Sequence, residues 1–278
     1  MNPTIPQILA GLLGCVTLAG CLGRPPAAPV AERPAVSRVF WDEREVADEA
    51  RQLRAAFAAE VPRHTACGPD PGADWIAPAR AQIHASGSRI DRPQLIVAVD
   101  RNPRHQRLCL LLAHPTRPWQ ALGGARVSTG AAGRHGYFIT PTGVFVHSAA
   151  ILDWRAEGTY NENHIRGLGR KGMRVWDFGW QQASRGWVPA DERGEIRMLL
   201  HATDPDVLEA RLGHAASKGC IRVSAAMNRF LDHYGVLDAD YERAAPTDAG
   251  IRALLPPDRM PTRLAGDMLV VIDSSEGR

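Results

Sequence analysis

Short apolar runs separated by turn residues occupy most of the chain after residue 93, and they limit the possible folds more than any other feature. The first run covers 95–100, and the turn residues 101–104 separate it from a second run at 106–113. Further strands are expected at 119–128, 137–139, 143–147, 197–200 and 269–272, and near residue 220. Many short strands with glycine and proline between them are typical of sandwiches and barrels. We therefore predict a mainly β domain with peripheral helices, of the α+β class, built as a β-sandwich or barrel.

The size and charge of the chain fit one such domain with appendages. Its 278 residues are 45% hydrophobic, and the formal net charge is only +3. The basic residues are single arginines spread along the chain, without a cluster or a nucleic-acid-binding motif. We therefore expect no nucleic-acid partner.

An amphipathic helix is predicted ahead of the β region. Apolar side chains recur at helical spacing within residues 42–61, at Val46, Ala50, Leu53, Phe57 and Val61. Such a helix needs a surface on which to bury this face, so it is expected to pack on the domain that follows. Residues 62–92 are rich in proline, glycine and aspartate and are expected to be irregular. The predicted organisation is a helix and irregular segment at 41–92, followed by the β domain at 93–275.

Two segments interrupt the β pattern. Residues 150–195 contain four tryptophans among several glycines, which suits either a lid that closes over a substrate or a cap on the edge of the core. Ser224 is expected to begin a helix that stops at Gly235, and residues 207–212 are expected to form a short helix.

Cys220 lies in the run Ser-Lys-Gly-Cys-Ile-Arg-Val, nineteen residues after His201. The thiolate is the attacking form of cysteine, and nearby positive charge favours it. Lys218 and Arg222 can supply that charge, and Gly219 leaves room for a substrate and frees backbone N–H groups for an oxyanion. Cys220 is therefore a candidate nucleophile and His201 a candidate base, although a lone cysteine is more often an inert buried residue.

Two blocks of the chain resemble the signature of the L,D-transpeptidases, whose catalytic domain is of the YkuD type. One block is His-Ala-Thr at 201–203 with Ser-Lys-Gly-Cys-Ile-Arg at 217–222. The other, upstream, is Val-Ser-Thr-Gly at 127–130 with Thr-Pro-Thr-Gly-Val-Phe at 140–145. The blocks follow each other in the family's order, and the resemblance covers residues 93–275. It implies a YkuD-like β-sandwich or barrel as the catalytic domain.

The resemblance also implies roles for the catalytic residues. Cys220 would attack an amide carbonyl, and His201 would be the base and later the acid for the leaving amine. The backbone carbonyl of Ala202 would orient the imidazole. The N–H groups of Gly219 and Cys220 would form the oxyanion hole.

Three neighbours of the cysteine would bind the substrate or support the loop. Arg222 would hold a substrate carboxylate, or else form a structural salt bridge. Lys218 occupies the place where the family usually has histidine; it would donate a hydrogen bond and stabilise the thiolate. Ser217 would hold the loop by a local hydrogen bond.

The reaction implied by the resemblance is a ping-pong acyl transfer on peptidoglycan stem peptides, with a second stem, a protein lysine or a D-amino acid as the acceptor. It needs no cofactor. A zinc site made of His147, His201 and Cys220 is the alternative chemistry, but no close metal-ligand spacing occurs in the sequence, so no metal is expected.

Two other functions compete with transfer. On the same scaffold water could take the acyl group, which would make the chain a hydrolase of wall cross-links or of protein–wall linkages. Because Lys218 replaces the usual histidine, an inactive wall-binding lipoprotein is the second alternative.

The N-terminus is predicted to be a signal peptide at 1–20. Residues 8–20 are apolar but too short to span a bilayer. The run Leu-Ala-Gly-Cys that ends at Cys21 resembles a bacterial lipobox, which implies cleavage before this cysteine and its lipidation. An uncleaved or plainly secreted chain is the alternative. Proline-rich residues 21–40 would form a tether, and the leucine after the cysteine indicates the outer membrane, facing the periplasm.

The remaining cysteines suit an oxidising compartment. Once Cys15 leaves with the signal peptide and Cys21 carries lipid, three cysteines are left, and a pair between Cys67 and Cys109 would leave Cys220 free. Because Cys109 lies in an apolar run, a buried free thiol at that position is an equal alternative.

Overall fold

The structure is a computed structural model that describes residues 41–65, 67, 75–188 and 192–275. The predicted signal peptide at 1–20 and the predicted lipidated tether at 21–40, with Cys21, lie outside these residues.

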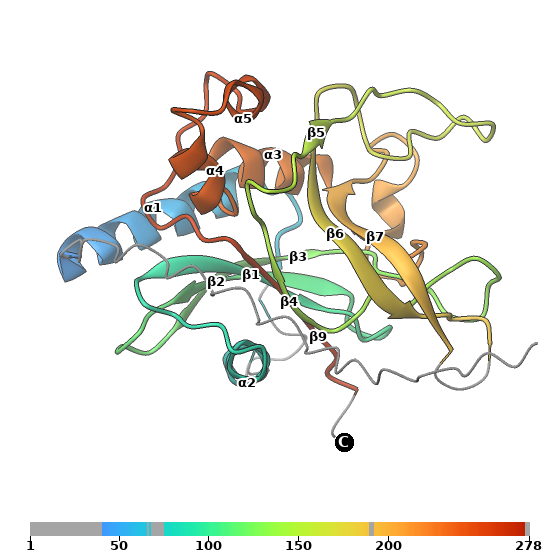
Figure 1. Ribbon diagram of the computed structural model, residues 1–278, viewed down its shortest axis with the longest axis horizontal. Coiled ribbons are helices and arrows are strands. Elements are labelled where there is room, and N and C mark those ends of the chain that lie inside the picture. Colours follow the sequence, from blue (N-terminus) through green and yellow to red (C-terminus); the bar gives the residue numbers. More distant parts are fainter. Residues whose placement is uncertain (1–40, 66, 68–74, 189–191, 276–278) are drawn as a thin grey trace, which may run out of the picture. The chain divides into compact units, whose positions relative to one another are not determined.

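Five strands form the first sheet, in the order β3-β2-β1-β9-β4 (Figure 1). They are β1 Gln94–Asp100, β2 Arg107–Ala113, β3 Gln120–Arg126, β4 Gly143–Val146 and β9 Met268–Ile272. β1 pairs antiparallel with β2 and parallel with β9, so β9 lies inside the sheet. Every residue of β1 and β9 is buried, because both faces of this part of the sheet are covered. The sequence predicted all five strands.

Four strands form the second sheet, in the order β5-β6-β7-β8. They are β5 Trp154–Arg155, β6 Arg174–Ser184, β7 Arg193–Ala202 and β8 Ile221–Val223. β6 and β7 form a long antiparallel pair, interrupted by an irregularity between Asp177 and Trp180. β8 pairs parallel with β7.

The two sheets share one hydrophobic core. Leu95, Val97 and Val99 of β1 belong to the same cluster of buried side chains as Met198 and Leu200 of β7. Side chains from the other face of β1, with those of β2 and β9, form a second cluster. The predicted mainly β fold of the α+β class is confirmed.

Helix α1 (Glu43–Glu60) is the predicted amphipathic helix. Asp42 caps it by accepting a hydrogen bond from the Arg44 N–H at 2.7 Å. The apolar positions expected to face the domain are all buried, and they join the core shared by the sheets: Val46, Ala50, Leu53, Phe57 and Val61. Residues Trp41–Arg278 form one compact unit.

Helix α2 (Ile76–Ala85) corrects the expectation that all of 62–92 is irregular. Pro78 suggested a break, but it lies in the first helical turn, where a missing N–H is tolerated. Ala79 and Ile83 are buried against the second cluster, so α2 covers the face of the first sheet that the second sheet leaves open (Figure 1).

Three short helices follow the cysteine strand. α3 (Ala225–His233) begins as predicted, with the Ser224 hydroxyl accepting from the Met227 N–H at 3.1 Å. The sequence did not predict α4 (Ala239–Ala244) or α5 (Ala249–Leu254). The expected helix at 207–212 is only a 3-10 turn, Glu209–Arg211. Among the described helices, none is both long and apolar enough to cross a membrane.

Two other expectations need correction. Residues 150–195 are not one lid, because they include β5 and β6, and Trp176 of β6 is fully buried in the core. Residues 137–139 form no strand; Phe138 makes a single bridge to Arg185. In residues 150–195, mixed aromatic and polar residues hide which side chains face inward until their partner strands are known.

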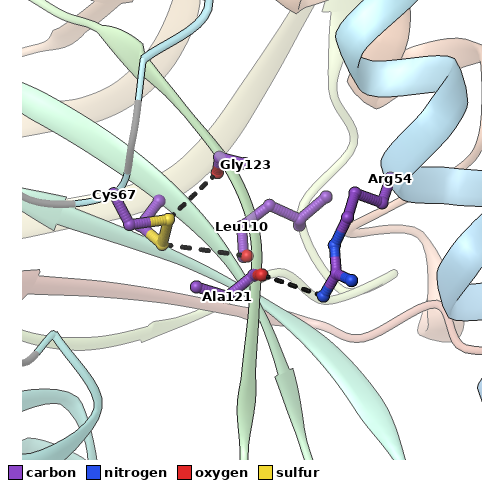
Figure 2. Close-up of a disulfide and its surroundings, with 6 residues drawn as sticks. Arg54, Cys67, Leu110, Ala121 and Gly123 are labelled. Atoms are coloured by element: carbon purple, nitrogen blue, oxygen red, sulfur yellow. Dashed lines mark hydrogen bonds between the residues drawn. A yellow bond between two sulfur atoms is a disulfide. The ribbon is translucent and has the colours of Figure 1, made fainter. Parts of the chain in front are cut away.

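A disulfide joins Cys67 to Cys109 (Figure 2), as one of the two interpretations of the sequence predicted. Cys109 is fully buried in β2, and Cys67 belongs to the segment between α1 and α2. The Cys67 sulfur lies 3.3 Å from the Gly123 carbonyl oxygen, so the bond packs over β3. On the helix side of the same strand, Arg54 of α1 donates to the Ala121 carbonyl at 3.2 Å.

Candidate active site

The parallel pair of β7 and β8 brings Cys220, His201 and Arg222 together. The register places His201 opposite Arg222, one step after the fully buried pair of Leu200 and Ile221. Successive side chains of a strand point to opposite faces. Cys220 directly precedes β8, so it shares the outer face of the second sheet with His201 and Arg222.

The Cys220 thiol is the free cysteine of the described residues and is partly buried. It donates a weak hydrogen bond to the Arg197 carbonyl at 3.7 Å. Burial raises the pKa of the Cys220 thiol, and this outweighs the opposing effects of the nearby Leu199 N–H and of the Arg222 charge. The Arg222 charge thus lowers this pKa as expected, but burial has the larger effect, so the thiol is neutral in the resting site.

His201 is buried, and its protonation state follows from two contacts. Burial, with a smaller contribution from the nearby Arg222 charge, lowers the pKa of His201 to about 4, although the hydrogen bond to Ala202 opposes this shift. Nδ1 lies 2.7 Å from the Ala202 carbonyl oxygen, which can only accept, so Nδ1 carries the proton. Nε2 of the neutral ring then has a free lone pair. The imidazole is thus oriented through Ala202, as predicted, and is ready to accept a proton.

The loop before Cys220 is fixed by hydrogen bonds. Gly219 has a φ of 132°, and a Cβ there would lie 2.8 Å from the Ile196 side chain, so this position requires glycine. The Gly219 N–H donates to the Ser217 hydroxyl at 3.0 Å, and that hydroxyl donates to the Cys220 carbonyl at 2.5 Å. Ser217 holds the loop as predicted. Gly219 does not offer its N–H to an oxyanion, and this expectation is corrected.

The upstream sequence block braces this loop. The Thr140 hydroxyl donates to the Gly219 carbonyl at 2.7 Å and accepts from the Gly130 N–H at 2.8 Å. Ser128 exchanges two backbone hydrogen bonds with Arg222. The two blocks recognised in the sequence therefore form one structure around the cysteine.

A family model described as YkuD, the L,D-transpeptidase catalytic domain, matches residues 96–240, which is more than half of the chain. The chain belongs to this family. A comparison with curated proteins gave no match. The matched range contains both sequence blocks, and β9 lies beyond it although it is hydrogen-bonded between β1 and β4. Membership indicates an enzyme of the L,D-transpeptidase type, with peptidoglycan as the substrate.

The Arg222 guanidinium of the L,D-transpeptidase domain has no carboxylate partner among the described residues. It donates to the Ala216 carbonyl at 3.4 Å, and its buried Nε has no hydrogen-bond partner in the described part of the chain. Burial lowers the pKa of Arg222. The structural salt bridge considered from the sequence is therefore not formed within the described ranges.

The Lys218 side chain lies over the Tyr137 ring. It is exposed, and the ammonium lies 5.8 Å from the centre of the Tyr137 ring. The expected support of the thiolate by Lys218 is not found, since Arg222 and not Lys218 acts on the Cys220 charge.

The histidine considered for a zinc site lies elsewhere. His147 contacts Asp153 at 2.9 Å and Leu237 at 2.8 Å, and it clusters with Asp153 and Asp238 rather than with the cysteine. Arg174 lies 2.8 Å from Asp153 and 3.3 Å from Asp238, so a guanidinium already pairs with both carboxylates. This group is a buried ion-pair network in the described structure.

Two residues beside the thiol had no signal in the sequence. Arg197 belongs to β7, and its carbonyl accepts from Cys220, while its guanidinium binds the buried carboxylate of Asp177 on β6. Neither residue belongs to a recognised motif. Only the pairing of β6 with β7 places them at the site.

Proposed function

We propose that the chain is a Cys220-dependent L,D-transpeptidase that cross-links or remodels peptidoglycan stem peptides. One observation carries this proposal: a neutral imidazole with a free Nε2 shares a sheet face with the partly exposed thiol of Cys220. General-base activation of a nucleophile requires this pair of groups. Family membership supplies the substrate class.

The first half-reaction forms a thioester. Nε2 of His201 takes the proton of the Cys220 thiol, and the sulfur attacks the carbonyl of the amide that precedes the terminal D-amino acid. The C–N bond breaks, and the imidazolium returns the proton to the leaving amine. The Cys220 N–H would stabilise the oxyanion, since the Gly219 N–H donates to Ser217 instead.

In the second half-reaction an amine replaces the D-amino acid. The amine of a second stem, a protein lysine or a free D-amino acid attacks the thioester, passes its proton to His201 and releases the Cys220 thiol. Arg222 would bind the carboxylate of the leaving residue, because it lies beside His201 and has no carboxylate partner among the described residues.

The test is to incubate the protein with a tetrapeptide stem and an excess of a D-amino acid, and to identify the products by mass spectrometry. We expect the original terminal residue to be exchanged for the added one. Appearance of the shortened peptide alone would assign the alternative hydrolase activity. Absence of both products, with no thioester on the folded protein, would support the alternative function of an inactive wall-binding lipoprotein.

The pH dependence of acylation provides a second prediction. Because the pKa of His201 is lowered from 6.5 to about 4, the base stays neutral over most of the acidic range. We expect the second-order rate of Cys220 acylation to be level from about pH 5.5 to 8 and to fall only as the pH drops through about 4. Rates should be measured by brief pH jumps, because the unfolded chain protonates His201 first and stability falls below pH 6.5.

The control for this profile is His201→Gln. It should slow acylation by about 10²- to 10⁴-fold and remove the fall in rate at low pH. An acidic limb near pH 6.5 in the unaltered protein would contradict a desolvated base.

We also propose that Cys21 is lipidated and that the catalytic domain faces the periplasm from the outer membrane. The apolar run at 8–20 and the lipobox-like sequence support this placement. Proline-rich residues 21–40 would then be the tether.

A further inference from the structure

The outer face of the second sheet continues past the cysteine to Trp180 and Arg197. These two residues are opposite each other on β6 and β7. Trp180 is 63% exposed, and the Arg197 side chain is 41% exposed. The Arg197 guanidinium lies 5.6 Å from the centre of the Trp180 ring. An aromatic face and a cation are therefore presented to solvent beside the thiol.

Arg197 is held in place from below. Its Nε lies 2.9 Å and its Nη2 2.6 Å from the Asp177 carboxylate, which is fully buried. This fork fixes the plane of the guanidinium. The remaining nitrogen, Nη1, has no hydrogen-bond partner within the described residues and can donate to a bound group.

The position of His201 determines the direction in which the donor peptide lies across the site. His201 and Arg222 lie at one end of the parallel pair, and Arg197 lies four residues before His201 on β7. The leaving amine must reach His201, so the terminal residue of the donor lies on that side of the sulfur. The acyl part of the donor, which stays attached to Cys220, then lies on the side of Arg197 and Trp180. Four strand residues span about 13 Å, which is enough for an extended side chain and its end group.

We propose that Trp180 and Arg197 form the subsite for the side chain of the acyl-donor residue, and that this side chain ends in a carboxylate. The Trp180 ring would cover its aliphatic part, and Nη1 of Arg197 would bind its end group. Arg222 then binds the carboxylate of the residue that leaves, and Arg197 binds the side-chain carboxylate of the residue that stays on the enzyme. This inference rests on the proposed function for the direction of the bound peptide.

The test measures binding, so it does not depend on turnover. In the full chain carrying Cys220→Ala, the affinity is measured by calorimetry for a tetrapeptide stem whose third residue is a diamino diacid. The peptide is used with its side-chain carboxylate free and as the carboxamide. We expect amidation to weaken binding about tenfold, the loss of one charge-assisted contact.

Adding Arg197→Gln should remove this preference, so that the two peptides bind with about equal affinity. Arg193→Gln is the matched control, because Arg193 is on the same strand and outer face and contacts only the Gln182 carbonyl among the described residues; it should keep the preference. Since Arg197→Gln leaves the buried Asp177 unpaired, the double variant Asp177→Asn/Arg197→Gln repeats the test without that charge.

Trp180→Ala should weaken both peptides equally. An unchanged preference after the loss of Arg197, or no preference or no binding with Cys220→Ala, would overturn the subsite. Failure of the proposed function shows separately, as the absence of exchange by the unaltered protein.

Discussion

Replacing Cys220 with alanine is expected to abolish the covalent adduct that a carbapenem forms with the protein. The acyl group of the drug must be held by a thioester, and Cys220 is the free thiol of the described residues, since Cys67 and Cys109 are joined. Alanine removes the attacking atom, so the acylation rate should fall by at least about 10³-fold. Intact mass spectrometry measures the adduct directly.

The fold of this variant should be preserved. The Cys220 thiol makes a weak 3.7 Å hydrogen bond to the Arg197 carbonyl, whereas the loop is held by Ser217 and Thr140. Thermal unfolding near that of the unaltered protein would confirm this. An adduct that persists in Cys220→Ala would place the nucleophile elsewhere in the chain.

Breaking the disulfide is expected to be the largest single loss of stability. The bond closes a loop of 42 residues, and restricting the unfolded chain over that length is worth about 3–4 kcal/mol. Cys67→Ala removes the bond with little loss of packing, because Cys67 is only partly buried. Denaturant unfolding with and without a reductant measures the effect.

The double variant Cys67→Ala/Cys109→Ala is the control for this interpretation. Each single change already breaks the bond, so the double variant should cost little more than Cys67→Ala alone. A stability that reductant does not change, or single effects that add fully, would show that the bond does not stabilise the fold.

The strands of the first sheet could be predicted because their signal is local. Residues 95–100 and 269–272 are buried on both faces, so they are continuous apolar runs. β6 has no such run, since Asp177 and Gly179 interrupt it at the irregularity in its pairing with β7. The sequence did not predict α2, because the proline in its first turn is typical of irregular structure.

The residues of the site likewise divide into those that the local sequence predicts and those that depend on the folded structure. Cys220 and His201 were found because their spacing and neighbours form a motif, and the structure places both on one sheet face. The Gly219 N–H was assigned wrongly, because a hydrogen bond to Ser217 depends on the loop's conformation. Residue type suggested that Lys218 acts on the thiol, but its direction places it over Tyr137. Arg197 has no sequence signal, since its position arises only when β7 lies between β6 and β8.

The central place of β9 affects the order in which the chain can fold during synthesis. β1 and β4 have no direct contact in the sheet, and residues 268–272 are the strand that joins them. Until those residues leave the ribosome, the first sheet exists only as the β1–β3 meander and a separate β4. Pairing across such a sequence distance is slow, because a long loop must close first. The first sheet therefore stays incomplete until residues 268–272 have been synthesised, whereas Gly130 and Thr140, which brace the cysteine loop, are already present.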